Sequence, residues 1–277
     1  MFVLHISKMA RFLTPFLVAL MAALPLHAET HLAREMVEAR ILPGWQMPDG
    51  SQMAALQIKL EPGWKTYWRA PGDAGIPPSF DWSGSENLAG FEVRWPTPSI
   101  LMQQGVRTIG YKNKLILPLK LTPLQAGRDI VLQGEVEIGV CSEICVPVTL
   151  ELNQLLPRGN KKPDPRIIAA LANRPDTADE ANVTRVSCEI TAMEDGLRLR
   201  AVVDMPSLGP GEVAILETAD PKVWVAQSST ARQGGRLIAE SDLYHVEGQL
   251  FSLQRTGLRI TIIGGNRAVD IQGCPAG

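Results

Sequence analysis

The sequence predicts an all-β fold of two tandem immunoglobulin-like sandwiches, joined by a linker that contains one short helix. Short apolar-alternating runs, separated by Pro, Gly, Asp and Ser, recur from about residue 44 to 156 and resume after residue 183. Many short strands punctuated in this way are typical of antiparallel sandwiches. Between the two blocks, residues 157–165 (PRGNKKPDP) show no apolar pattern, which indicates a linker.

The expected elements follow from these runs. Strands are predicted in the first block at residues 52–60, 91–95, 114–121, 131–140 and 146–152. In the second block they are predicted at residues 185–190, 197–203, 212–217, 223–227, 235–239 and 258–264. A helix is expected at residues 166–173, with Asp164 as its N-cap and Pro165 in its first turn. The second block spans about 95 residues, the size of one immunoglobulin-like sandwich.

An export signal is predicted before the first block. Lys8 and Arg11 precede an uncharged stretch, residues 12–28, that ends in alanine. This is the layout of a cleaved secretory signal peptide. The alternative is a membrane anchor, but Pro15 and Pro25 interrupt a stretch of only about 17 residues, at the lower limit for spanning a bilayer. We therefore expect four segments: signal peptide 1–28, first sandwich 29–157, linker 158–182 and second sandwich 183–277.

Composition excludes several functions. The chain has 27 Lys and Arg against 29 Asp and Glu, without the basic tracts of a nucleic-acid binder. His31 and His245 are the histidines outside the predicted signal, and no His/Cys cluster has zinc spacing. Neither a Gly-rich phosphate loop nor a Ser/His/Asp signature is apparent. We expect no cofactor, no nucleic-acid partner and a monomer.

Cys141 and Cys145, spaced C-x3-C, are the most informative residues. In an extended strand their Cα atoms would lie about 13 Å apart, at roughly 3.3 Å per residue. A disulfide requires roughly 4.4–6.8 Å, so the backbone must reverse between them. Both flanks have strand patterns, which places residues 142–144 at the tip of a hairpin. A small ring gains little stability from cross-linking, and exposed, strained disulfides are the labile or catalytic ones. The pair is interpreted as a redox site.

The other two cysteines, Cys188 and Cys274, lie in the first strand of the second block and near the end of the chain. A disulfide between them would close a long loop and stabilise the unit by about 4–5 kcal/mol in loop-closure theory. We expect a structural staple. A second redox pair is the alternative, although nothing in the sequence favours it.

A family resemblance supports this interpretation. The motifs that carry it are residues 62–77 (PGWKTYWRAPGDAGIP), 81–82 (DW), 93–98 (VRWPTP), 110–111 (GY), 115–119 (LILPL) and the C-x3-C followed by Val-Pro. Over about residues 35–157 the chain resembles the N-terminal periplasmic domain of DsbD-type thiol:disulfide interchange proteins, in the branch of the copper-sensitivity suppressor ScsB. The second block matches that branch in size and position only.

The resemblance implies an immunoglobulin-like redox domain in the periplasm, active as a protein-disulfide reductase. Its electron donor would be a membrane-embedded thiol carrier of the DsbD/CcdA type, and its acceptor a thioredoxin-like periplasmic protein. Family members often carry the membrane carrier and a thioredoxin-like domain in one chain. This sequence shows neither, so we expect either a separate membrane partner or a different role. The resemblance also implies that Cys145 attacks the partner and that Cys141 resolves the mixed disulfide.

The surroundings of the pair are less well specified. Tyr67, Trp68 and Tyr111 are candidates to line the site, and the alternative for each is the sandwich core. Residues 73–75 match the family's aromatic cap loop too loosely to predict a cap. No Lys, Arg or His is adjacent to the pair in sequence, so any activation of a thiol must come from across the fold. The cysteines and scattered methionines could bind soft Cu(I), but the methionines show no tight spacing, so no metal site is predicted.

Two functional hypotheses remain open. The first is a thiol-disulfide relay through Cys141 and Cys145. The second is a non-catalytic sandwich that binds or chaperones a partner, with a link to copper tolerance as one form of this role, in which the C-x3-C bridge only staples a hairpin. The reduction potential of the bridge distinguishes them.

Overall fold

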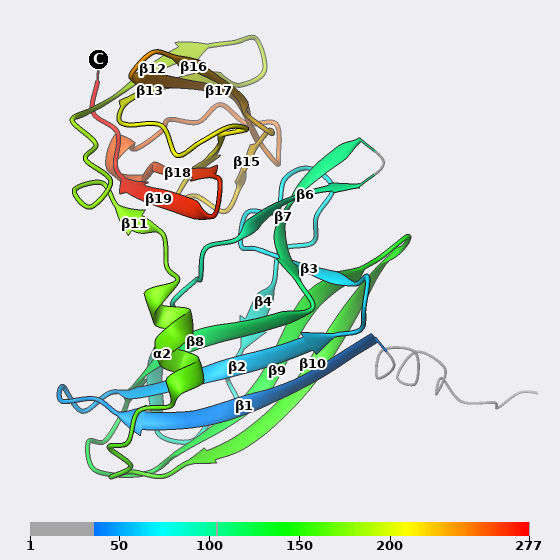
Figure 1. Ribbon diagram of the computed structural model, residues 1–277, viewed down its shortest axis with the longest axis vertical. Coiled ribbons are helices and arrows are strands. Elements are labelled where there is room, and N and C mark those ends of the chain that lie inside the picture. The colour runs from blue at the N-terminus through cyan, green and yellow to red at the C-terminus, as the bar shows by residue number, and fades with distance from the viewer. Residues whose placement is uncertain (1–35, 104, 277) are drawn as a thin grey trace, which may run out of the picture.

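The computed structural model describes residues 36–103 and 105–276. Two β-sandwiches are stacked along the long axis of the molecule, with helix α2 (Pro165–Ala172) beside the first (Figure 1). The predicted all-β class, with two sandwiches and a helical linker, is confirmed. The predicted signal peptide lies outside the described residues. Within the described ranges, no helix has the length and apolar character needed to cross a bilayer.

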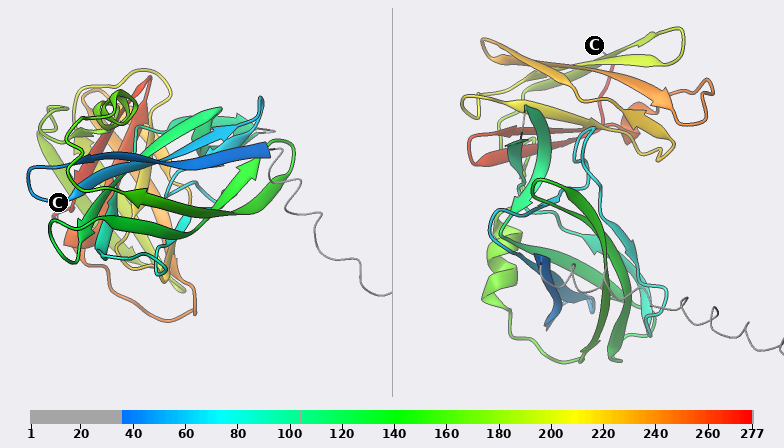
Figure 2. Two further views of the ribbon diagram at one scale, coloured as in Figure 1. Left: turned by 90° about the horizontal axis from the view of Figure 1, so that it is seen from below. Right: turned by 90° about the vertical axis from the view of Figure 1, so that its right-hand side faces the viewer.

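The first unit consists of two facing sheets (Figure 2). One has the strand order β1-β2-β8-β5, and the other has the order β10-β9-β3-β7-β6 with β4 paired to β9. The strands are β1 Val37–Gln46, β2 Gln52–Leu60, β3 Lys65–Tyr67, β4 Ser79–Asp81, β5 Leu88–Val93, β6 Ser99–Gln103, β7 Val106–Lys112, β8 Lys114–Pro123, β9 Ile130–Cys141 and β10 Cys145–Leu156.

The alternation of apolar and polar side chains along a strand explains which face of the strand is buried. In β10, Val148, Leu150 and Leu152 point into the core, while Thr149 and Glu151 between them are exposed. Successive side chains of a strand point to opposite faces, so one face of this strand packs and the other meets water.

Strand β2 is buried along almost its whole length because helix α2 covers its outer face. Ile167 of α2 packs with Met53 and Ala55 of β2. The predicted cap of this helix is confirmed, since the Asp164 carboxylate accepts a hydrogen bond from the backbone N–H of Arg166 at 2.9 Å. Such a cap satisfies a backbone donor that the first helical turn leaves free.

The second unit is also a sandwich of two sheets. Their strand orders are β11-β19-β18-β14 and β12-β13-β17-β15, with β16 also paired to β17. The elements are β11 Asp176–Thr177, β12 Arg185–Ala192, β13 Leu197–Asp204, β14 Val213–Glu217, β15 Val223–Val225, β16 Ser229–Gln233, β17 Arg236–His245, the 3-10 turn η1 Arg255–Gly257, β18 Arg259–Gly264 and β19 Arg267–Gln272.

A disulfide closes the second unit. Cys188 in β12 and Cys274 after β19 are bonded, with their Cα atoms 5.6 Å apart, and both residues are buried in the core of the unit. The bridge spans 86 positions of sequence and holds the segment after β19 against β12. We interpret it as structural.

The two units pack directly on each other. Ile263 and Ala268 of the second unit belong to the same cluster of buried apolar side chains as the core of the first unit. The segment predicted as linker also contributes β11, which pairs in parallel with β19. Apolar contacts, and not the linker alone, therefore connect the sandwiches.

Candidate functional site

The Cys141–Cys145 pair closes the hairpin between β9 and β10. The two residues are directly opposite in the strand register and are joined by a disulfide, with their Cα atoms 4.2 Å apart. The predicted hairpin is thus confirmed, with Ser142, Glu143 and Ile144 at its tip. Cys141 is fully buried, whereas Cys145 is exposed. The asymmetry arises because β9 lies between β10 and β3 in the sheet, while β10 is an edge strand.

Tyr67 is the aromatic residue that contacts both sulfur atoms. Its hydroxyl lies 2.9 Å from Sγ of Cys141 and 3.1 Å from Sγ of Cys145. A disulfide sulfur carries no proton, so the phenol is the donor in both contacts. The side chain is only 1% exposed, and burial raises its pKa. The hydroxyl therefore stays protonated at neutral pH and remains available as a donor.

Two glycines make room for the Tyr67 ring. A Cβ atom on Gly139 of β9 would lie 2.8 Å from Cδ2 of Tyr67 and 2.8 Å from Cβ of Ile76. A Cβ atom on Gly75 would lie 3.0 Å from Cδ1 of the same ring and closer still to Pro71. The ring is thus enclosed between Gly139 and the loop of residues 71–77, which we call the cap segment. The sequence did not assign a cap here, because the segment carries no aromatic residue.

Lys65 is a site residue that sequence reasoning missed. It is directly opposite Cys141 in the pairing of β3 with β9, and it is only 6% exposed. Its Nζ donates to Oγ1 of Thr108 at 3.2 Å and lies 5.7 Å from the centre of the Tyr67 ring. Burial, with a smaller contribution from the charge of Lys112, lowers the pKa of Lys65. The site therefore holds a desolvated cation beside the aromatic ring that contacts the sulfurs.

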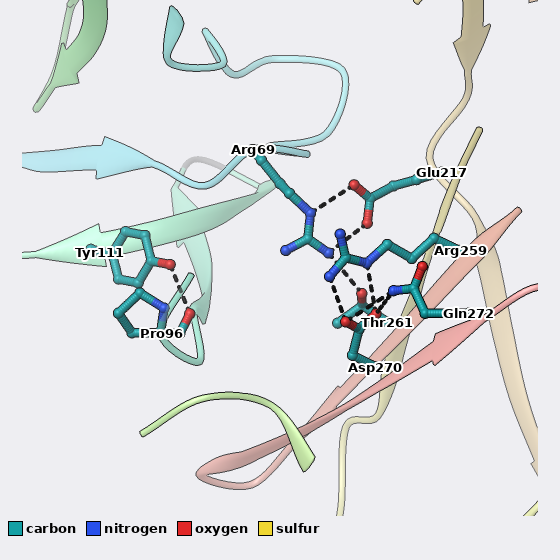
Figure 3. Close-up of polar contacts among 8 residues, drawn as sticks. All are labelled: Arg69, Pro96, Tyr111, Glu217, Arg259, Thr261, Asp270 and Gln272. Carbon is teal, nitrogen blue, oxygen red and sulfur yellow. Dashed lines mark hydrogen bonds and ion pairs between the residues drawn. The ribbon is translucent and has the colours of Figure 1, made fainter. Parts of the chain in front are cut away.

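The other two aromatic candidates lie in the core and do not contact the sulfurs. Trp68 is fully buried, and the guanidinium of Arg69 lies 3.8 Å from the centre of its ring. Tyr111 is buried and donates its hydroxyl to the carbonyl of Pro96 at 2.8 Å (Figure 3). The physical reason is strand alternation: the side chain that follows Tyr67 must point to the opposite face of the sheet, toward the core. Tyr111 shares that face through its register pairing with Thr66.

The described residues contain no group of three or more His, Cys, Asp or Glu side chains arranged to hold a metal ion. The groups gathered at this site are a disulfide bridge, a phenol donor and a nearby buried cation.

The comparisons with known proteins agree with this geometry. Residues 38–157 match the family described as "Thiol:disulfide interchange protein DsbD, N-terminal". The match lies within the first unit, which is therefore similar to this family. The resemblance predicted from the sequence is thus confirmed. The C-x3-C hairpin lies at the end of β9, inside the matched residues.

A solved structure resembles the whole described chain. The N-terminal periplasmic domain of ScsB from Proteus mirabilis has a TM-score of 0.67 and 20% sequence identity, and covers 88% of this chain and 95% of that chain. At this identity the likeness shows the shared fold of both units. No curated protein matches the sequence. The match over residues 38–157 supports, in general terms, a role in thiol-disulfide exchange with thiol-disulfide partners.

Proposed function

We propose that this protein is a periplasmic thiol-disulfide exchange protein that passes reducing equivalents through Cys141 and Cys145. The observation that carries the proposal is the asymmetric bridge itself, in which a buried Cys141 is bonded to an exposed Cys145 while the Tyr67 hydroxyl donates to both sulfurs. A partner can approach one sulfur, and the other is held back to complete the exchange.

The proposed exchange balances in both electrons and protons. The exposed Cys145 thiolate of the reduced pair attacks one sulfur of a partner disulfide; a mixed disulfide forms and the partner's second sulfur leaves as a thiolate. Cys141, having lost its proton, then attacks the Cys145 sulfur. The mixed bond breaks, the intramolecular bridge forms, and the partner is released with two thiols. Two electrons and two protons pass to the partner.

We infer donor and acceptor from the family. A membrane-embedded thiol carrier would regenerate the reduced pair by the reverse exchange, and thioredoxin-like or other exported proteins would be the acceptors. An oxidising compartment such as the periplasm suits a chain in which all four cysteines are paired. The predicted export signal supports the same location.

The reduction potential of Cys141–Cys145 tests the proposal. The fraction of free thiol would be measured by thiol trapping across a dithiothreitol or glutathione series. We expect a potential between roughly −120 and −270 mV, the range of thiol-exchange proteins. A bridge that stays oxidised below about −300 mV would be a structural staple and would leave the alternative, a non-catalytic binding or chaperone module.

Single variants test the roles of the two sulfurs. Cys141→Ser leaves the exposed Cys145 to attack a model disulfide with no resolving partner, so a mixed disulfide should accumulate. Cys145→Ser leaves only the buried Cys141, and the adduct should form far more slowly. Equal adduct formation by the two variants would contradict the assigned order.

A further inference from the structure

The cap segment has two contact surfaces. One surface covers the cysteine site, because Gly75 abuts the Tyr67 ring and Ile76 lies against Gly139. The other faces the second unit, where a Cβ atom on Gly72 would lie 2.8 Å from Nε2 of Gln227. The segment is therefore a layer between the redox hairpin and the second sandwich.

Arg69 attaches the start of this layer to the second unit (Figure 3). Its Nε and one terminal nitrogen donate to the two oxygens of Glu217 in β14, both at 2.9 Å. The same terminal nitrogen lies 3.2 Å from Oγ1 of Thr261 in β18. The two charged side chains are only 15% and 18% exposed. A bidentate pair of this kind fixes orientation as well as distance.

A second attachment lies beside the first. A terminal nitrogen of Arg107 in β7 donates to the carbonyl of Ser228 at 2.9 Å, and Nε2 of Gln227 donates to the carbonyl of Arg107 at 3.0 Å. Strand β7 in turn holds the cap segment, since the N–H of Ile109 donates to the carbonyl of Pro71 at 3.0 Å. The second unit thus contacts the chain on two sides of the cap segment: Arg69, just before it, and β7, which is hydrogen-bonded to it.

We propose that the second unit is a clamp that holds the cap segment over Tyr67 and so limits access to the cysteine pair, with Arg69 as the positioning residue. The inference rests on the proposed exchange function of Cys141 and Cys145. It gives the second sandwich a role at the site although the side chain that contacts the sulfurs of Cys141 and Cys145, Tyr67, belongs to the first. Loosening the clamp frees the cap segment, lets the Tyr67 ring move, and uncovers Cys141.

The sequence neighbours of Arg69 explain how a change in the Arg69–Glu217 pair can alter the surroundings of the Cys141 and Cys145 sulfurs. Tyr67, two residues earlier in the chain, contacts both cysteines, and Pro71, two residues later, begins the cap segment. Between them, Trp68 is fixed in the core and stacks beneath the Arg69 guanidinium. A shift of the guanidinium therefore displaces a short, fully packed stretch of chain.

The test is Glu217→Gln in the full-length mature chain, with two readouts. The first is hydrogen exchange of the backbone amides of residues 70–77. The second is the alkylation rate of Cys141 by iodoacetamide, measured in a Cys145→Ser background in which Cys141 is the free thiol. Loss of one charge-assisted bidentate pair should speed both by about tenfold. Gln227→Ala, at the second attachment, should act in the same direction.

Glu212→Gln is the matched control. It breaks another bidentate, largely buried ion pair of the second unit, with Arg232, away from the cap segment, and should change neither readout. Unchanged exchange or unchanged alkylation in Glu217→Gln would overturn the clamp, as would equal changes in Glu212→Gln. These readouts do not depend on electron transfer, so failure of the clamp is distinguishable from a reduction potential that rules out the proposed function.

Discussion

The hydroxyl of Tyr67 lies 2.9 Å from the buried sulfur of Cys141, although 74 positions of sequence separate the two residues. The contact requires β3 and β9 to be neighbours in one sheet, and it requires glycine at position 139 so that the ring can lie against the strand. The site is consequently built by strand pairing, with the hairpin supplying the sulfurs and β3 the groups that surround them.

Tyr67→Phe should slow thiol reactivity with little loss of stability. The substitution keeps the ring and removes the hydroxyl that donates to both sulfurs, and a donor to a thiolate favours the charged form. Alkylation of the reduced pair at pH 7 should fall severalfold, and its pH profile should move to higher pH. Tyr111→Phe is the control, because its hydroxyl bonds to Pro96 and not to a cysteine. An identical profile for wild type and Tyr67→Phe would contradict the assigned role.

Gly139→Ala should disturb the site through packing. The new methyl would lie 2.8 Å from both the Tyr67 ring and Ile76, so one of them must move. We expect a loss of about 1–3 kcal/mol in the free energy of unfolding, typical of overpacking, together with altered cysteine reactivity. Urea denaturation and alkylation rates measure the two effects. Gly90→Ala in β5 is the control, since no atom lies within 4 Å of the added carbon. Equal effects of the two variants would contradict the close packing of the Tyr67 ring against Gly139.

Lys65 should make stability depend on alkaline pH. Its pKa is lowered by burial, so between the lowered value and the ordinary value of 10.5 the unfolded chain binds more protons than the folded chain. The free energy of unfolding contributed by this residue therefore increases as the pH rises through that interval. Lys65→Met should abolish this increase and should be relatively more stable at pH 7 than at pH 10, compared with wild type. Parallel pH curves for the two proteins, from urea denaturation, would refute the prediction.

Removal of the Cys188–Cys274 bridge should destabilise the protein strongly. The bridge closes a separation of 86 residues, and loop-closure theory gives a stabilisation of about 4–5 kcal/mol for a loop of that order. The double Cys→Ala variant should lose most of that amount in urea denaturation. The double Cys→Ser variant at positions 141 and 145 should lose less, because its loop spans 4 positions. If the larger loss came from the hairpin bridge, the assignment of a structural and a redox disulfide would be reversed.

Local patterns in the sequence predicted the fold class well. Strand β2 occupies the predicted residues, and β8, β9, β12, β13 and β18 lie within a few residues of the predicted bounds. The short strands β3, β4, β6 and β7 were missed because they lie in stretches rich in Pro, Gly and polar residues, where alternation is too brief to detect. The predicted strand at residues 91–95 is shifted toward the N-terminus, as β5 ends at Val93 shortly before Pro96.

The sequence by itself determined the cysteine hairpin, because both sulfurs and both flanking strands lie within one short stretch of chain. The tertiary structure alone decided which side chains surround it. Tyr67 and Trp68 are adjacent aromatic residues that no local pattern distinguishes, and only the register of β3 on β9 turns one toward the sulfurs and the other into the core. Lys65 enters the site through the same register, and Arg69 reaches Glu217 across 148 positions of sequence. Periodicity fixes that alternate side chains share a face, but strand pairing and the packing of the two units fix what each face meets.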